Sequence, residues 1–337
     1  MTPSPARVLL SMATAYRTSK LLYVAAKLGI ADLVAEEPQT CEEMAASVGA
    51  SADALCRVMR GLAMLGIFEL QAGGRYAQTE LSEALRSGVD GSVRPGVIFW
   101  GEEQYRAWSE LLHTVMTGEP AFNEVYGDPF TYYDQHPETG QAFDSLMSEA
   151  SGQVASGIVY TYDFPDHGTV VDVGGGEGIL LTTILKSRPR LSGILLDRAQ
   201  VVEKARRLVD EEGLLDRCRV VAGDFRRTVP RGGDVYILRN VIHDWDDAGA
   251  LSILNACGRA MKRSSRLLVI QREIPDPLTI EPYARSVVEA DLMQMVYSGG
   301  RERTLPQYRA LIEAAGLRIY QTMAMSGHTW LMEARKA

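Results

Sequence analysis

The sequence contains little of what marks a metalloprotein, a membrane protein or a nucleic-acid binder. Its 337 residues include four cysteines and five histidines, and the cysteines lack metal-ligand spacing. No apolar run is long enough to span a bilayer, and the first residues lack the layout of a signal peptide. The formal net charge of -8 argues against binding to nucleic-acid phosphates. We therefore expect a cytoplasmic protein without a metal ion and without a membrane or nucleic-acid partner.

The four cysteines are scattered along the chain, at Cys41, Cys56, Cys218 and Cys257. Thiols of cytoplasmic proteins are usually kept reduced. We therefore expect all four to be free thiols that are buried or half-buried.

The first hundred residues read as short helices followed by a small hairpin. Thr40 and Glu43 have capping-box spacing, which predicts a helix after Thr40, and Ser51 can cap the next helix. Two short runs, 67–70 and 75–77, flank a Gly-Gly pair, which predicts two antiparallel strands. Helices followed by a two-stranded wing are typical of a winged helix, a fold that often binds DNA.

The charges of this region favour a dimer interface over DNA binding. The expected recognition helix offers only Arg57 and Arg60, and acidic residues stand close by, so a DNA-binding regulator is the weakest alternative. Residues 21–30 are more apolar than one small domain needs, and an exposed apolar face usually marks an interface. We interpret residues 1–100 as a winged-helix-like dimerisation domain that forms a homodimer.

The rest of the chain reads as a helical linker followed by an α/β domain. Residues 101–163 are helical and rich in aromatic side chains, some of which could line a pocket for a flat ligand. From residue 164 onward, strand and helix patterns alternate, which predicts a mostly parallel sheet with helices on both faces. Two late strands, near 317–322 and 328–333, have so short a connection that they must be antiparallel. The expected fold is a Rossmann-like domain, 164–337, that ends in an antiparallel hairpin. The expected parallel strands are 169–173, 192–197, 219–222, 235–238 and 266–270.

The strongest local motif is a glycine-rich turn after the first of these strands. Its glycines have Gly-x-Gly-x-Gly spacing and include Gly174 and Gly176, which let the backbone turn sharply and let a ligand approach closely. Dinucleotide-binding enzymes also have a glycine-rich turn here, but with Gly-x-Gly-x-x-Gly spacing. Asp172 precedes the first glycine by two residues and could help to hold a zwitterionic ligand.

Acidic residues also follow the next two strands. Asp197 ends the second strand, where a carboxylate can take both hydroxyls of a ribose. After the third strand, Asp224 could accept from an adenine amine and Phe225 could cover its ring. Ligands of such sheets bind along the carboxyl edge of the strands, so we expect these residues to share one site.

Taken together, these motifs resemble one enzyme family over essentially the whole chain. The chain is similar to the plant-type and bacterial natural-product O-methyltransferases, the caffeic-acid and isoflavone O-methyltransferase group. The segments that carry the resemblance are 170–178, 195–197, 223–225, 240–247 and 299–304.

The resemblance implies a set of cofactor-binding residues. It implies that S-adenosylmethionine is the cofactor and S-adenosylhomocysteine the product, and that Gly174 and its neighbours hold the methionine part. It assigns the ribose to Asp197 and the adenine to Asp224 with Phe225. Arg239 stands where family members often have a lysine that touches the cofactor. Phe143 and Met147 match residues that close over cofactor and substrate, although aromatic and methionine side chains at helical spacing are more often plain core.

The catalytic candidates centre on one histidine. His243 follows the fourth strand, on the edge where the cofactor is expected, and histidine suits proton transfer near neutral pH. In the family, acidic side chains flank this histidine, and Glu302 matches one of them. The other position carries Gln271, which can hydrogen-bond the ring but brings no charge to raise its pKa. A different register would make Glu273 the second acid.

Further residues are candidates for substrate binding. The methionine-rich segment 291–297 is expected to form a helix over the pocket, where Met293 or Met295 could clamp a flat ring. Ordinary helix packing accounts for each methionine about as well. Trp108 and Asp244 complete this set.

The resulting hypothesis is an O-methyltransferase that acts on a hydroxyl of a small phenolic, catecholic or polycyclic natural-product intermediate, with His243 as general base. Two alternatives stay open. Some relatives keep the fold and the cofactor but decarboxylate, hydroxylate or rearrange their substrates, and Gln271 is the residue that keeps this reading open. An N-methyltransferase would not need a strong base.

Overall fold

The protein divides into two compact units, Met1–Arg106 and Ala107–Ala337. The computed structural model describes residues 4–326 and 328–337. Within helix α12 (Pro137–Thr161) the side chains at 138, 141, 142, 144–151 and 153 lie outside the description. In the described part of the chain, every helix is too short or too polar to cross a membrane.

The amino-terminal unit is mainly helical, with a small three-stranded sheet. The Thr40–Glu43 capping box starts α4 (Cys41–Val48), and the Ser51 side chain caps α5 (Ala52–Met64), as predicted. Strands β2 (Glu69–Leu70) and β3 (Arg75–Ala77) pair antiparallel, and β1 (Gln39–Thr40) pairs with β3 as a third strand that the sequence did not suggest. Its elements are α1 (Pro5–Ala13), α2 (Tyr16–Lys27), α3 (Ile30–Leu33), β1 (Gln39–Thr40), α4 (Cys41–Val48), α5 (Ala52–Met64), β2 (Glu69–Leu70), β3 (Arg75–Ala77), α6 (Glu80–Glu83) and α7 (Arg94–Gly101).

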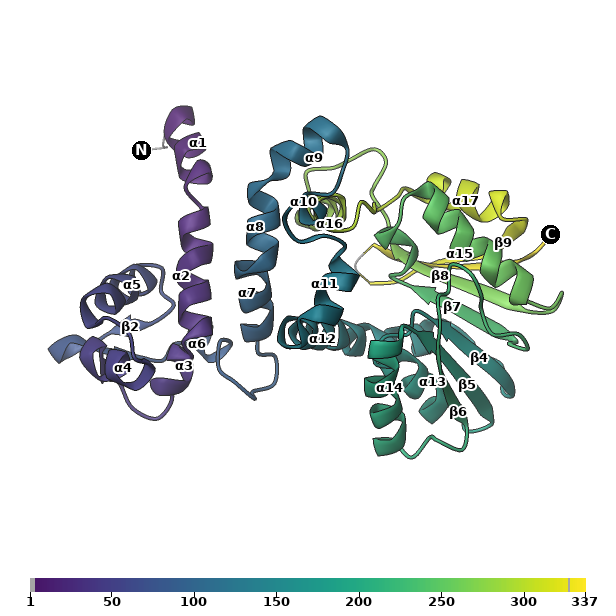
Figure 1. The fold of residues 1–337 in the computed structure, drawn as a ribbon, viewed down its shortest axis with the longest axis horizontal. Helices are drawn as coiled ribbons and strands as arrows, with labels where there is room; N and C mark the ends of the chain where they lie inside the picture. Colours follow the sequence, from purple (N-terminus) through teal and green to yellow (C-terminus); the bar gives the residue numbers. More distant parts are fainter. Residues whose placement is uncertain (1–3, 327) are drawn as a thin grey trace. The chain divides into compact units, whose positions relative to one another are not determined.

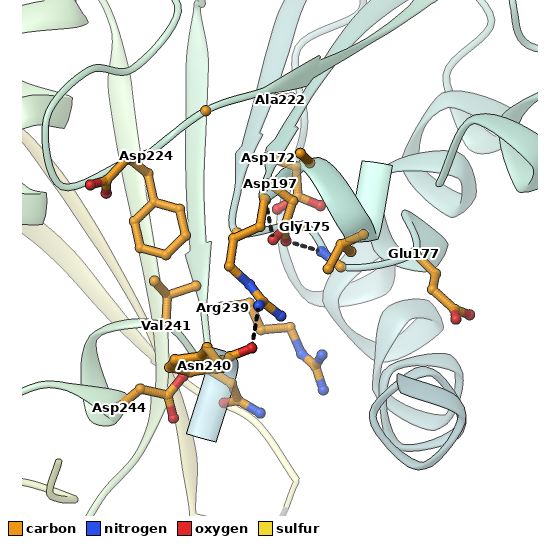
Figure 2. Close-up of a pocket in the computed structure, with 18 of the residues that line it drawn as sticks. Asp172, Gly175, Glu177, Asp197, Ala222, Asp224, Arg239, Asn240, Val241 and Asp244 are labelled. Carbon is orange, nitrogen blue, oxygen red and sulfur yellow. Dashed lines mark hydrogen bonds between the residues drawn. The ribbon is translucent and has the colours of Figure 1, made fainter. Parts of the chain in front are cut away.

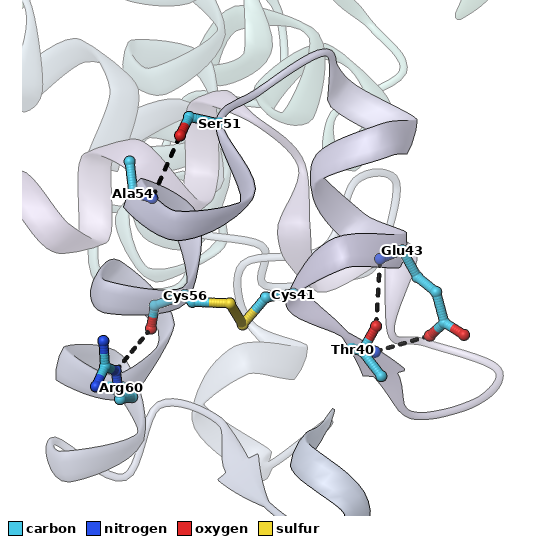
Figure 3. The surroundings of a disulfide bond; sticks show 7 residues. All are labelled: Thr40, Cys41, Glu43, Ser51, Ala54, Cys56 and Arg60. Carbon is cyan, nitrogen blue, oxygen red and sulfur yellow. Dashed lines mark hydrogen bonds between the residues drawn. A yellow bond between two sulfur atoms is a disulfide. The ribbon is translucent and has the colours of Figure 1, made fainter.

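Two cysteines of this unit depart from the expectation of free thiols. Cys41 at the start of α4 and Cys56 in α5 form a disulfide across Cα atoms 5.2 Å apart (Figure 3). The spacing of 15 residues gave no sign of this pairing, because only the packing of α4 against α5 brings the two side chains together. Cys218 and Cys257 are free and buried, as expected.

The apolar segment 21–30 also differs from its interpretation as an exposed face. Ala25, Ala26 and Ile30 are buried in the core of their own unit, and Leu21 and Leu22 pack against it. Exposed apolar side chains of this unit include Leu9, Leu10 and Met12 on α1, each about two thirds exposed.

The second unit joins a group of helices to a seven-stranded sheet. Helix α8 (Glu103–Ser109) begins before the boundary at residue 106 and ends after it. The helices that precede the sheet are α9 (Leu111–Thr117), α10 (Ala121–Tyr126), α11 (Pro129–Gln135) and α12 (Pro137–Thr161). The strands are β4 (Gly168–Val173), β5 (Leu191–Asp197), β6 (Cys218–Ala222), β7 (Val235–Arg239), β8 (Arg266–Arg272), β9 (Leu317–Ala324) and β10 (Thr329–Lys336). The remaining helices are α13 (Ile179–Ser187), α14 (Ala199–Glu211), α15 (Asp247–Ala260), α16 (Pro282–Tyr297) and α17 (Leu305–Ala314).

The sheet buries both of its faces, which makes the fold doubly wound. Successive residues of a strand point to opposite faces, so Val170 packs in the core with α12, α13 and α14, whereas Val171 packs in the core with α15 and α17. Figure 1 shows these two groups of helices on opposite sides of the sheet. The prediction of a mostly parallel sheet with a terminal antiparallel hairpin is confirmed.

The order of the strands shows where a ligand is expected to bind at the edge of the sheet. The order is β6-β5-β4-β7-β8-β10-β9, with β10 antiparallel to both of its neighbours. The chain moves outward from β4 to β5 and β6, then returns to the other side of β4 as β7. Such a switch opens a crevice at the carboxyl ends of the strands, where ligands of this architecture bind.

Candidate active site

The turn after β4 needs glycine at the point where it approaches β7. Gly174 has a φ of 72°, and a Cβ there would lie 2.7 Å from Cγ2 of Val241. Its backbone N–H donates to the carbonyl of Leu196 at 2.8 Å, which ties the turn to the end of β5. A side chain at this position would both strain the backbone and collide with the wall of the crevice.

Asp172 is a buried carboxyl group beneath this turn. The residue is 2% exposed, and its Oδ2 atom lacks a hydrogen-bond partner among the described residues. Burial raises the pKa of Asp172 to about 7, although the nearby charge of Arg239 opposes the shift. An unpaired buried acceptor is costly, so this atom is suited to a donor that a ligand brings.

Two more carboxylates hold positions at the same edge. Asp197 accepts from the backbone N–H of Gly176 at 2.8 Å and from that of Arg198 at 2.7 Å. Asp224 accepts from Nε of Arg226 at 3.0 Å, and the two side chains form an ion pair. Hydrogen bonds from Arg226 hold the pKa of Asp224 below its usual value.

These groups line one cavity of about 730 Å³ at the switch between β4 and β7. In Figure 2, Asp172, Asp197 and Arg239 lie near the centre of the view, with Asp224 and Asp244 to their left. The predicted site residues that line the cavity are Asp172, Gly174, Gly176, Asp197, Asp224, Phe225, Arg239, Phe143 and Asp244. Its wall continues over further residues of α11 and the loop after β7, among them Phe130 and Trp245.

His243 lies beside this cavity, between two carboxylates. Its Nδ1 atom is 2.8 Å from Oε1 of Glu302, and its Nε2 atom is 3.4 Å from Oδ1 of Asp244. The amide Nε2 of Gln294 on α16 is 3.5 Å from Nε2 of His243. Burial of the ring opposes protonation, but attraction to Glu302 and Asp244 outweighs it and raises the pKa of His243 to about 9.

Comparison with known proteins agrees with this geometry. Residues 10–88 match the model of the O-methyltransferase dimerisation domain, and residues 108–318 match that of the O-methyltransferase domain. A phenazine O-methyltransferase of Lysobacter antibioticus is 42% identical over 97% of this chain and 95% of its own.

The chain belongs to the O-methyltransferase family.

Two further relatives of this O-methyltransferase differ in the acceptor atom that they methylate. A phenazine-1-carboxylate N-methyltransferase of Pseudomonas aeruginosa is 34% identical over 98% of both chains. A solved O-methyltransferase of neocarzinostatin biosynthesis, in complex with S-adenosylhomocysteine and 1,4-dihydroxy-2-naphthoic acid, superposes with a TM-score of 0.87. It is 33% identical and covers 95% of this chain and 96% of its own. This enzyme uses S-adenosylmethionine, and the turn at Gly174, the unpaired Asp172 oxygen and the Asp197 carboxylate fit this cofactor.

Gln271 has partners other than the histidine ring. It is fully buried at the end of β8, and its side-chain oxygen accepts from the backbone N–H groups of Asn240 and Val241, at 3.2 Å and 3.1 Å. The sequence left open a hydrogen bond from Gln271 to the ring; the structure shows the amide oxygen at the backbone after β7 instead, where the β7–β8 pairing places it. Glu273 forms a β-bridge with Arg303, and Asp244 supplies the second carboxylate at the ring.

Several substrate-binding candidates are not among the described residues that line the cavity. Met293, Met295 and Trp108 are half-buried and outside its lining. Phe143 does line it, and stacks on Tyr133 with ring centroids 5.1 Å apart. The side chain of Met147 lies outside the described residues.

The sequence pattern did not reveal the residues that fix the backbone of the segment after β7, which carries His243. Arg303 is 1% exposed and donates to the carbonyls of Ile242 and Trp245, at 3.1 Å and 2.9 Å. It also forms a 2.8 Å ion pair with Asp247 at the start of α15. Gly300 packs so closely on the backbone of His243 that a Cβ there would collide with its carbonyl. Arg303 and Gly300 both lie in segment 299–304, which carries part of the family resemblance, but from that segment only Glu302 was assigned a role.

Proposed function

We propose that this enzyme transfers a methyl group to a hydroxyl of a small phenolic, catecholic or polycyclic natural-product intermediate, with His243 as general base. The observation that carries the proposal is the position of His243, beside the cavity and held between the carboxylates of Glu302 and Asp244. When bound, S-adenosylmethionine supplies a methyl group that is activated by its positively charged sulfur.

The residues of the chain have three tasks in this reaction. Asp172, Asp197 and Asp224 hold the cofactor at the carboxyl edge of the sheet. Aromatic side chains near the cavity, including Phe130 and Phe143, orient a flat acceptor so that its oxygen faces the methyl group.

The third task is proton removal. Nε2 of His243 takes the hydroxyl proton, and the Glu302 carboxylate at Nδ1 stabilises the imidazolium that results. Below a pH of about 9 most of the free enzyme carries a charged His243, so the neutral minority is the reactive form.

We further propose that the enzyme works as a homodimer formed through its amino-terminal unit. The match to the dimerisation domain supports this, and the exposed side chains of α1 offer an apolar surface for a second copy. Light scattering during size exclusion is expected to give twice the chain mass, and a clean monomer would contradict the proposal.

The direct test is an assay with S-adenosylmethionine and a panel of phenols, catechols and hydroxylated polycycles, read by mass spectrometry. Wild type is expected to add one methyl group to some of them, and His243→Gln to lose most of that activity. His113→Gln on α9 is the matched control, because His113 lies neither in the lining of the cavity nor in the segment after β7 that carries His243. Unchanged activity of His243→Gln would contradict the assignment of the base.

N-methylation is a second candidate, supported by the phenazine-1-carboxylate N-methyltransferase among the relatives. A heteroaromatic nitrogen attacks with its own lone pair and needs no base. Aromatic amines and heterocycles in the same panel separate the two reactions, because N-methylation would persist in His243→Gln. Chemistry without methyl transfer would appear as a change of mass other than one methyl group, or as an isomer of unchanged mass with a different retention time.

A further inference from the structure

The side chain that faces the reactive nitrogen of His243 from α16 is an amide. Gln294 is 4% exposed, and its Nε2 atom lies 3.5 Å from Nε2 of His243. Because Glu302 occupies Nδ1, Nε2 is the ring atom that a substrate hydroxyl can reach. A hydroxyl bonded to that nitrogen would therefore enter beside the amide of Gln294.

The orientation of this amide is set by its neighbours. Ser298 lies one helical turn further along α16, and its Oγ atom is 3.0 Å from Oε1 of Gln294. The backbone N–H of Gly300 donates to the same Oγ atom at 3.3 Å, so the Ser298 hydroxyl proton is available for Oε1. With the oxygen engaged in this way, the NH₂ group of Gln294 points toward the histidine.

The two N–H bonds of this NH₂ group are not equally satisfied. The amide of Gln294 also acts on the carboxyl group of Asp244, whose pKa it works to lower against the effect of burial. The contact with His243 is 3.5 Å, longer than the ~2.7–3.2 Å of a well-formed N–H hydrogen bond. A buried donor with a poor partner favours any ligand that brings an acceptor atom to it.

We propose that Gln294 selects aromatic acceptors that carry a hydrogen-bond acceptor atom next to the hydroxyl that is methylated. Such an atom is a ring nitrogen or a carbonyl or carboxylate oxygen on the neighbouring position. This inference rests on the proposed function, since it requires the hydroxyl to lie at Nε2 of His243. The geometry is suitable, because a neighbouring substituent lies only about one hydrogen-bond length from the hydroxyl oxygen.

The experiment compares acceptors that differ only in the neighbouring atom. 8-Hydroxyquinoline has a ring nitrogen beside its hydroxyl, whereas 1-naphthol has a C–H group there. 4-Hydroxyacridine and 1-hydroxyanthracene form a second, larger pair. For at least one pair, wild type is expected to show kcat/KM about tenfold to hundredfold higher for the nitrogen member, the range expected when a buried donor gains or loses its partner.

Substitution of Gln294 tests whether this preference arises from its amide. Gln294→Met keeps the length of the side chain without the N–H donors. It is expected to bring the ratio of kcat/KM between the nitrogen member and the C–H member of a pair close to one. Ser298→Ala, which releases the orientation of the amide, is expected to lower the ratio by less. Gln71→Met, in the amino-terminal unit, is the matched control and should keep the wild-type ratio.

The outcomes separate this inference from the proposed function. A ratio near one in wild type, or a ratio that survives in Gln294→Met, would overturn the selection by Gln294. Methylation of other phenols without binding or turnover of any pair would overturn it as well. Failure to methylate any hydroxyl in the panel would instead refute the proposed function and the inference with it. Because the readout is a ratio of two substrates, a general loss of folded enzyme does not alter it.

Discussion

Glu302 lies 2.8 Å from Nδ1 of His243 and is itself 3% exposed. Its other carboxylate oxygen accepts from the Tyr308 hydroxyl at 3.3 Å, and its backbone N–H donates to Asp291. The carboxylate is therefore fixed in place from α16 and α17 before any ligand binds. A charged histidine is stabilised by this contact, which has consequences for both pH dependence and mutation.

The rate of methyl transfer is expected to rise with pH until His243 is neutral. The pKa of His243 is raised to about 9, so roughly one molecule in a hundred has a neutral ring at pH 7. The value of kcat/KM should increase about tenfold per pH unit and level off near pH 9. The measurement needs an acceptor whose own pKa lies outside this range, and a flat profile would contradict the assignment of His243 as base.

Removing the charge of Glu302 should shift this profile toward acid. Glu302→Gln keeps a hydrogen-bonding group at Nδ1 but loses the attraction that raises the pKa of His243. The rising limb is expected at lower pH, and the plateau value of kcat is expected to fall about tenfold to hundredfold, within the usual contribution of general base catalysis. Glu313→Gln, on the exposed side of α17, should leave the profile in place. An unshifted limb in Glu302→Gln would show that the carboxylate does not act on the ring.

Cofactor affinity is expected to depend on the absence of a side chain at residue 174. Gly174→Ala adds a Cβ atom 2.7 Å from Val241 at a φ of 72°, and should weaken S-adenosylhomocysteine binding at least tenfold in titration calorimetry. Gly213→Ala is the control, because Gly213 has a φ of 67° with open space around it. Equal affinities of the two variants would mean that the turn tolerates a side chain.

Arg303 is expected to stabilise the loop that carries His243. Arg303→Lys keeps the charge but cannot bond the carbonyls of Ile242 and Trp245 together with Asp247, so the free energy of unfolding should fall by about 1–3 kcal/mol. Arg309→Lys, an exposed position on α17, should change it by less than about 0.5 kcal/mol. Denaturant titration of both variants measures the difference, and equal midpoints would contradict the role of Arg303.

The Cys41–Cys56 bond should be detectable by alkylation of the unfolded protein. Without reductant, mass spectrometry is expected to show labels on Cys218 and Cys257 alone, and with reductant on all four cysteines. A loop of this length contributes about 3 kcal/mol, so Cys56→Ser should lower the stability of the amino-terminal unit. Four labels without reductant would show that the thiols are free in solution.

The sequence by itself determined the architecture and the cofactor edge of this enzyme. Alternating apolar residues specify strands with two buried faces, and this local pattern requires no knowledge of the neighbours. The glycine turn, the carboxylates of Asp172 and Asp197 at the ends of β4 and β5, and that of Asp224 after β6 could be located because each lies at or directly after the end of its strand along the chain. The start of α4 was equally local, since Thr40 and Glu43 cap the helix across a single turn.

The family resemblance pointed to Glu302 as a neighbour of His243, and the tertiary structure added Asp244 and Gln294. Glu302 and Gln294 are 59 and 51 residues away along the chain, and their contacts depend on how α16 and the loop before α17 pack against the turn after β7. The same is true of Gln271, which the strand pairing directs to the backbone, and of Cys41 with Cys56. A contact between distant segments depends on the relative placement of whole elements, and no spacing along the chain encodes that placement.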